Sequence, residues 1–156
     1  MSHDFRIEGM SEHCAREYLN WKYQPPYDVY NVSPARYDEV FREIFHGKGR
    51  HFTVFSGEEM VGIYEYTLHN GVMEIGLGLT PSLTGMGMGA KFVQACLDFA
   101  IDRLKYKGNK FILKVAEFNQ RAIRVYENLG FKETSREDEP SGKKSIRFVY
   151  MEKMIE

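Results

Sequence analysis

The chain has 156 residues, of which 43% are apolar and 14% aromatic, and its net charge at neutral pH is −1. This length and composition are typical of one domain with one core, so we expect a single domain over residues 1–156. The 21 basic and 22 acidic residues form no long block of either sign, which argues against a general affinity for nucleic acid or for an anionic membrane.

The sequence also carries none of the usual signals for a membrane or an oxidising compartment. No apolar segment approaches the roughly 20 residues of a membrane span, and the start, MSHDFRIEGM, lacks the apolar stretch of a secretory signal. Cys14 and Cys96 lie far apart and form no C-x-x-C pair, so we interpret them as reduced thiols. We therefore expect a cytoplasmic protein.

The first third of the chain predicts two helices separated by an aromatic loop. After a short strand at residues 5–7, a helix should begin behind Ser11, whose side chain can cap it. A second helix is expected over residues 34–45, because Ser33 and Pro34 are a favoured cap and first-turn residue. The loop between the helices, NWKYQPPYDVYN, concentrates aromatic side chains around two prolines.

The centre of the chain predicts an antiparallel meander. Three strand-like segments follow one another, HFTVFS at 51–56, VGIYEYTL at 61–68 and VMEIGLGL at 72–79. The Asn70-Gly71 pair between the last two is a strong hairpin signal. Beyond them we expect a helix over 87–104, a strand over 110–117, a helix over 119–129 and two strands joined by the turn EPSGKK. This order predicts an α+β fold.

The string TGMGMGAKF at residues 84–92 is the most unusual local feature. Its glycines satisfy the G-x-G-x-x-G/A spacing of a dinucleotide-binding turn, but that motif normally follows the first strand and is followed about 20 residues later by an acidic residue, where this chain has Asn109. The Gly-Lys-Ser/Thr of a nucleoside triphosphate loop is absent. A third interpretation is that the glycines only turn a strand into a helix.

A second motif decides between these interpretations. Asn119, Ala122, Tyr126, Gly130 and Phe131 match the pattern N-x-x-A-x-x-x-Y-x-x-x-G-F, and the glycine string matches Q/R-x-x-G-x-G/A at Gly87 and Gly89 but has Thr84 at the Q/R position. In this order and separation, the two segments resemble the two signatures of the GNAT superfamily of N-acetyltransferases. The close similarity covers residues 74–133.

The resemblance implies a GNAT-like fold and acetyl-CoA as the cofactor. The expected fold is a mostly antiparallel mixed sheet of about seven strands with about four helices, splayed between strands 4 and 5. The backbone N–H groups of the loop and the positive end of the following helix would hold the pyrophosphate. The expected cofactor-binding residues are Leu77, Leu79, Thr84, Gly85, Met86, Gly87, Met88, Gly89, Ala90, Asn119, Ala122 and Tyr126.

The resemblance also suggests catalytic residues. It implies that Tyr126 acts as general acid on the CoA sulfur, because a phenol with a pKa near 10 can protonate a leaving thiolate without being ionised at neutral pH. Alternation along the strand at 72–79 places Glu74 on the same face as two glycines, and by analogy Glu74 is the candidate base, with Glu65 as its rival. The family also commonly has a β-bulge in this strand.

The acceptor should be a primary amine, either a small molecule or part of a peptide. The loop at 20–31 holds Trp21, Tyr23, Tyr27 and Tyr30, and we expect an aromatic wall or lid there, with Trp21, Tyr27 and Tyr30 contacting the acceptor; the alternative is that these aromatics pack the loop onto the core. The acetyl group would pass directly to the amine, and no metal is expected, because the histidines and cysteines show no ligand spacing. A different interpretation is an acyl-CoA-binding regulatory or interaction module without transfer activity. The identity of the amine, and whether the protein is a monomer or a homodimer, stay open.

Overall fold

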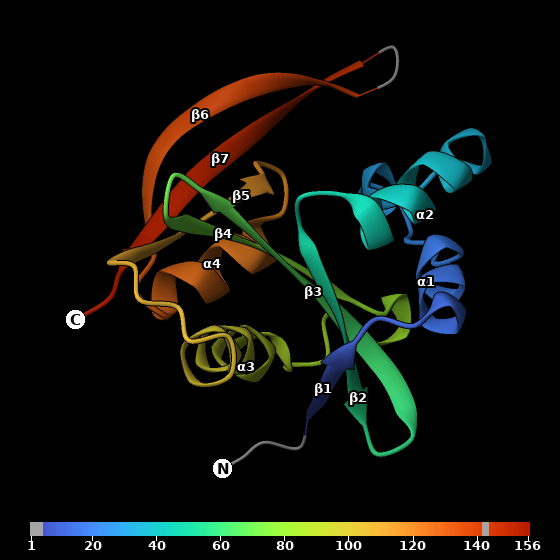
Figure 1. Cartoon of the computed structure of the whole chain (residues 1–156). Helices are drawn as coiled ribbons and strands as arrows, with labels where there is room; N and C mark the ends of the chain where they lie inside the picture. The colour runs from blue at the N-terminus through green and yellow to red at the C-terminus, as the bar shows by residue number, and fades with distance from the viewer. Residues whose placement is uncertain (1–4, 142–143) are drawn as a thin grey trace.

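A computed structural model describes residues 5–141 and 144–156 of the chain, which form one mixed sheet with helices on both faces (Figure 1). The sheet has seven strands in the order β1-β2-β3-β4-β5-β7-β6. The strands are β1 Arg6–Gly9, β2 Arg50–Ser56, β3 Glu59–His69, β4 Val72–Leu79, β5 Lys110–Ala116, β6 Lys132–Ser141 and β7 Lys144–Met154. Two residues of the predicted turn EPSGKK, 142 and 143, lie outside the described residues.

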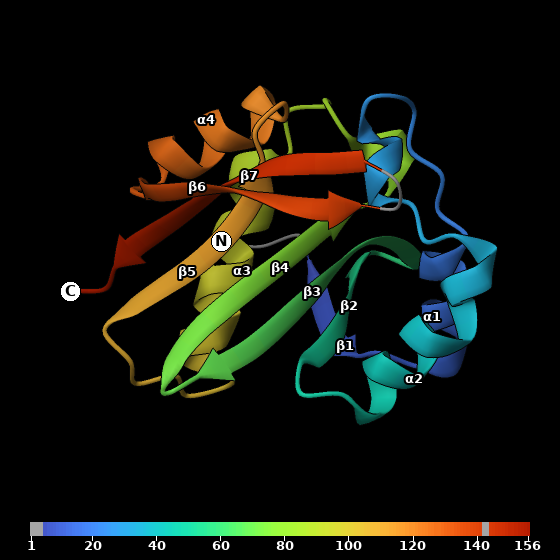
Figure 2. The ribbon, with the colours of Figure 1, turned by 90° about the horizontal axis from the view of Figure 1, so that it is seen from above.

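Four α-helices accompany the sheet, as the sequence predicts. They are α1 Glu12–Leu19, α2 Tyr37–His46, α3 Gly89–Asp102 and α4 Gln120–Asn128, with short 3₁₀ helices η1 Tyr27–Tyr30, η2 Pro34–Arg36 and η3 Pro81–Leu83. Figures 1 and 2 show α1 and α2 on one side of the sheet, against the β1–β3 half, and α3 and α4 on the other. Within the described residues, no helix is long and apolar enough to cross a membrane.

Local sequence signals set most of the element boundaries. The side chain of Ser11 accepts a hydrogen bond from the backbone N–H of Cys14 and so caps α1. Asn70 and Gly71 both have positive φ, of 52° and 84°, as a two-residue type I′ hairpin requires. The second predicted helix is different: residues 34–36 form a 3₁₀ turn, and Ser33 makes no side-chain cap. The α-helix begins only at Tyr37.

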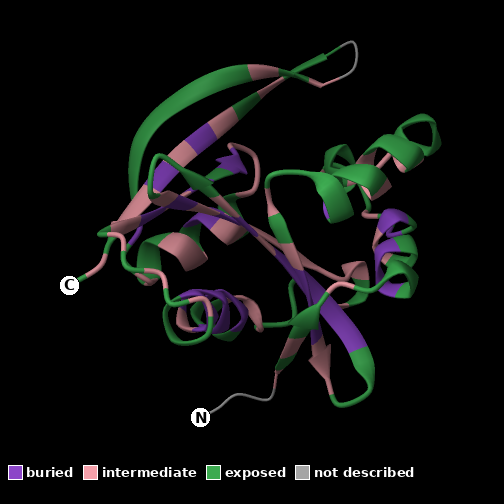
Figure 3. Cartoon of the chain, in the orientation of Figure 1, coloured by how far each residue is buried: buried purple, intermediate pink, exposed green. Residues whose placement is uncertain are grey.

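The main core lies between the sheet and helices α3 and α4 (Figure 3). Tyr64 and Tyr66 of β3 are fully buried there, and their hydroxyls donate to the backbone carbonyls of Phe92 and Cys96 at 2.6 and 2.7 Å. These bonds attach α3 to the sheet without leaving a buried hydroxyl unpaired. A smaller cluster of Cys14, Trp21, Met60 and Ile63 packs α1 onto the opposite face.

Candidate active site

The candidate site lies where β4 and β5 separate. These two parallel strands pair only through Met73 with Phe111 and Glu74 with Ile112, although β4 continues to Leu79 and β5 to Ala116. A cavity of about 670 Å³ occupies the resulting gap and is lined by residues from both faces of the sheet. The predicted splay between strands 4 and 5 is therefore present. The predicted β-bulge is not, because β3 and β4 pair without a register shift.

The glycine loop forms one wall of this cavity. Gly85 and Gly87 have φ of +76° and +80°, which L side chains rarely adopt, and a Cβ on Gly87 would meet no atom within 4 Å. Met88 caps α3 without a side-chain hydrogen bond, so its first-turn N–H groups have no side-chain acceptor. The loop and the helix N-terminus together form an open concavity with hydrogen-bond donors, which suits a diphosphate.

Helix α4 brings the second motif to the opposite side of the same cavity. The side chain of Asn119 accepts from the N–H of Ala122 at 3.2 Å, capping the helix, and its amide nitrogen lies 3.4 Å from the hydroxyl of Tyr30. Asn119, Ala122 and Tyr126 all line the cavity. The helix stops before Gly130, whose φ is +102°.

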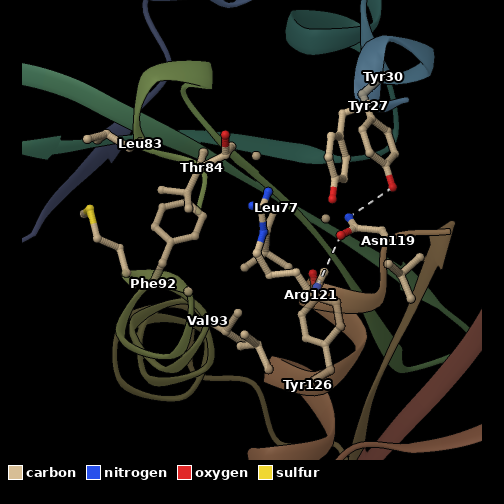
Figure 4. A pocket seen from close by; sticks show the side chains of 18 of the residues that line it. Tyr27, Tyr30, Leu77, Leu83, Thr84, Phe92, Val93, Asn119, Arg121 and Tyr126 are labelled. Carbon is tan, nitrogen blue, oxygen red and sulfur yellow. Dashed lines mark hydrogen bonds between the residues drawn. The ribbon is translucent and has the colours of Figure 1, made fainter. Parts of the chain in front are cut away.

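Tyr126 presents its hydroxyl to the cavity (Figure 4). Its ring packs edge-on against Phe131 of the core, with the ring centroids 5.7 Å apart, and the hydroxyl has no hydrogen-bond partner within the part of the chain that the structure describes. Burial, with smaller contributions from Cys96 and Tyr30, raises the pKa of Tyr126 well above its usual value. The phenol is therefore a protonated donor over the whole physiological range.

The aromatic loop forms the third wall, with one exception among its predicted aromatic residues. Tyr27 and Tyr30 line the cavity, together with Tyr23, whose hydroxyl donates to the carbonyl of Leu79 at 2.5 Å. Trp21 does not: it is buried against Tyr18 and lies behind Gly78. Trp21 therefore packs against β4 and does not face the cavity.

The structure separates the two candidate carboxylates. Glu74 lies outside the cavity lining, at the paired end of β4, and its carboxylate is 2.7 Å from Nε2 of His69. Glu65 lies opposite Gly76, and its carboxylate comes closest to Gly49, where a Cβ would lie 2.5 Å from Oε2 of Glu65. Among the described residues, Glu65 is the one carboxylate that lines the cavity.

A second cavity of about 440 Å³ begins on the other side of Glu65, under α1 and α2. Tyr18 and Glu65 line both cavities. In the second, Nε2 of His51 is 3.5 Å from Oε2 of Glu65, and its buried Nδ1 has no partner among the described residues. Glu65 therefore stands between two spaces that a ligand or water can occupy.

Most of the other residues predicted to bind the cofactor line the cavity. Leu77, Leu79, Thr84, Gly85, Gly87, Met88, Gly89 and Ala90 all line the cavity. Met86 does not, and with 67% of its surface exposed it points to solvent. Arg121, which lines the cavity from α4, is not among the residues that the sequence predicts for the site. Its position inside the second motif was visible, and it is exposed, as an arginine in the first turn of a helix usually is; only the packing of α4 beside the loop brings its guanidinium to the cavity.

Comparisons with known proteins agree with this geometry. A family model described as an acetyltransferase (GNAT) domain matches residues 5–132. Among solved structures, a chimera of spermidine N-acetyltransferase SpeG from Vibrio cholerae and hSSAT has a TM-score of 0.80 at 20% identity, covering 97% of this chain and 96% of that one. The V. cholerae spermidine N-acetyltransferase in complex with CoA and spermine gives 0.77 at 20% identity, with 97% and 95% covered. A search of curated proteins found no match.

Proposed function

Because this chain belongs to the GNAT family of acetyltransferases, in which acetyl-CoA donates an acetyl group to an amine, we propose that its acceptor is a polyamine, bound with the reacting nitrogen near Glu65. One observation carries the proposal: a single carboxylate lies between two cavities of about 670 and 440 Å³. Tyr18 and Glu65 line both cavities, so a long, thin polycation can place ammonium groups on the two sides of Glu65, whereas a compact amine would occupy only one cavity.

The surroundings of Glu65 suit an ammonium group. Tyr18, Tyr23 and Tyr30 line the same cavity, and aromatic faces attract alkylammonium ions. The second cavity adds Glu43 and two basic residues, Arg36 and Lys48; Arg36 is paired with Glu39 at 3.3 Å. The likeness in fold to proteins that are described as spermidine N-acetyltransferases, one of them in complex with spermine, supports the same class of acceptor.

Glu65 and Tyr126 have different roles in the transfer of the acetyl group. Acetyl-CoA supplies the activated acyl group and a thiolate as leaving group. Glu65 takes one proton from the ammonium form of the acceptor, because only the free amine has the lone pair that attacks a thioester. Tyr126 donates its phenolic hydrogen toward the position of the sulfur, from the opposite side of the cavity. The attack forms the C–N bond as the C–S bond breaks; the nitrogen loses its second proton to water, and CoA departs as a thiolate that accepts a hydrogen bond from Tyr126, so no acyl-enzyme is needed.

His51 can accept the proton that Glu65 takes from the ammonium group. Its ring lies behind Glu65 in the second cavity, so the proton can move away from the thioester.

We further propose that the reaction takes place in the cytoplasm, and this rests on the two free cysteines, Cys14 and Cys96, since free thiols are typical of reducing compartments.

The test is an amine panel with two glutamine variants. Purified protein is given acetyl-CoA with spermine, spermidine, putrescine or a lysine peptide, and thiol release is followed against pH. We expect the polyamines to be the best acceptors. Glu65→Gln should lower their turnover by about 10- to 1,000-fold and move the pH profile upward, where more free amine is present. Glu74→Gln is the matched control, with activity within about twofold of the parent.

Three outcomes would count against the proposal. A Glu74→Gln loss equal to that of Glu65→Gln would return the role of base to Glu74. Faster transfer to the lysine peptide than to any polyamine would reject the acceptor class. Binding of acetyl-CoA by calorimetry without turnover of any amine would favour the acyl-CoA-binding module.

A further inference from the structure

The glycine loop lacks a side-chain donor for a phosphate at its first position. Thr84 occupies the place where the signature has glutamine or arginine, and its hydroxyl donates to the carbonyl of Pro81 at 2.8 Å. The hydroxyl therefore stabilises the η3 turn. The loop offers a diphosphate only backbone N–H groups.

Arg121 lies directly in front of this loop. A Cβ built on Gly85 would be 2.6 Å from Nη1 of Arg121, so the guanidinium faces the loop across the cavity (Figure 4). The guanidinium carbon is 5.2 Å from the ring centroid of Tyr27, a separation typical of a cation–π contact. The aromatic ring therefore helps to hold the charge in front of the loop.

The positive charge of Arg121 is not neutralised by a carboxylate among the described residues, so it can attract an anion. The cavity has two basic residues in its lining, Lys114 and Arg121. Lys114 is neutralised by Glu139 at 2.6 Å. Arg121 has no carboxylate within salt-bridge distance in the part of the chain that the structure describes. An unneutralised guanidinium beside a concavity of backbone N–H groups is a site for an anion.

We propose that Arg121 is a diphosphate-binding residue of acetyl-CoA and replaces the side-chain donor that Thr84 does not provide. The identity of the anion rests on membership of the acetyltransferase family and not on the choice of a polyamine as acceptor. A guanidinium suits this task because its N–H groups are arranged in a planar fork that can donate to two phosphate oxygens together. A donor from α4 can thus take the place of a donor from the loop, because both elements face the same cavity.

The experiment measures CoA binding by calorimetry, which needs no acceptor and no turnover. Arg121→Gln keeps much of the side-chain stem and removes the charge. It should weaken binding of CoA by about 10- to 100-fold. Arg124→Gln is the matched control, since Arg124 is an exposed residue of the same helix outside the cavity lining. Its affinity should stay within about twofold of the parent. Thermal melts of both variants check the fold.

Three further measurements assign the contact. 3′-Dephospho-CoA keeps the diphosphate, so Arg121→Gln should weaken its binding by the same factor as that of CoA. Adding Thr84→Arg to Arg121→Gln restores the pattern of the signature and should recover most of the lost affinity. Arg121→Lys, which keeps the charge but not the fork, should fall between the parent and Arg121→Gln.

The inference fails under any of three results. Unchanged CoA affinity in a folded Arg121→Gln variant would remove Arg121 from the site. A loss for CoA but not for 3′-dephospho-CoA would place the contact at the 3′-phosphate. No recovery on adding Thr84→Arg would show that positions 84 and 121 are not interchangeable. Failure of the polyamine proposal is separate, because it would leave all of these affinities as expected.

Discussion

Replacing Tyr126 by phenylalanine removes one hydroxyl that points into the cavity and leaves a ring that packs against Phe131. The core contact should survive, so the variant isolates the contribution of the phenol. In the parent protein, burial raises the pKa of Tyr126 above its usual value of 10.0. The phenol of Tyr126 is therefore a weaker acid than the thiol, whose pKa is near 8.5, and full proton transfer to the thiolate is unfavourable. We expect Tyr126 to stabilise the developing thiolate by a hydrogen bond instead.

Proton transfer and hydrogen bonding by Tyr126 predict different losses of rate in the Tyr126→Phe variant. Full general-acid catalysis is worth about 10²- to 10⁴-fold in rate. A hydrogen bond to a charged group contributes about 1.5–3 kcal/mol, which corresponds to about 10- to 150-fold. Because the pKa of Tyr126 is raised, we expect Tyr126→Phe to lower the turnover rate by an amount in this second range. Affinity for acetyl-CoA should remain nearly unchanged.

The assay is thiol release at saturating acetyl-CoA and amine, with CoA affinity measured separately by calorimetry. An acyl donor with a more acidic thiol should recover part of the loss, because its thiolate needs less stabilisation. In the parent, deprotonation of Tyr126 would abolish the donor, and the raised pKa moves that event to more alkaline pH. The rate should therefore rise as the amine deprotonates, with no decline from Tyr126 below about pH 10. A parallel loss of affinity with an unchanged chemical step would refute this role.

Three other changes test the loop, the packing and the thiols. Gly87→Val should weaken acetyl-CoA binding by at least about tenfold, since its side chain would enter open space at a φ of +80°; unchanged affinity in calorimetry would mean that the loop is not the pyrophosphate site. Gly62→Ala should lower the free energy of unfolding by about 1–3 kcal/mol in denaturant titrations, because the methyl would overlap the ring of Phe92; equal stability would show that α3 can shift freely. Burial raises the pKa of Cys96 to about 12, so iodoacetamide at pH 8 should alkylate it only after unfolding, and mass spectrometry showing modification of the native protein would contradict that.

Much of the fold could be predicted from the sequence, because its signals are local. Alternation in VMEIGLGL places Met73 and Ile75 toward the core and the glycines on the other face, as the structure has them. The Asn70-Gly71 turn determines the β3–β4 hairpin by its backbone angles alone. Ser33 shows the limit of such signals: Ser-Pro favours a helix start, but the first turn is 3₁₀ and the serine caps nothing through its side chain.

The choice between Glu74 and Glu65 could also have been made from the sequence. A two-residue turn at Asn70-Gly71 pairs His69 with Val72, and counting outward along both strands places Glu65 opposite Gly76. The same count places Glu74 opposite Thr67, nearer the turn. The position of Arg121 relative to Gly85 could not have been predicted in this way, because it depends on how α4 packs beside a loop more than thirty residues earlier in the chain.

The separation of β4 from β5 explains why the aromatic loop and the cofactor strand meet. Beyond Glu74, β4 has no ladder partner on the β5 side, and backbone groups that lose a ladder need other partners or water. At Leu79 the carbonyl accepts from the hydroxyl of Tyr23, so the loop supplies the partner that β5 does not. The carbonyl of Leu79 thus accepts from Tyr23, while the backbone of Leu77 and the N–H of Leu79 have no partner in β5. Any movement of Tyr23 on binding an amine would reach β4 directly.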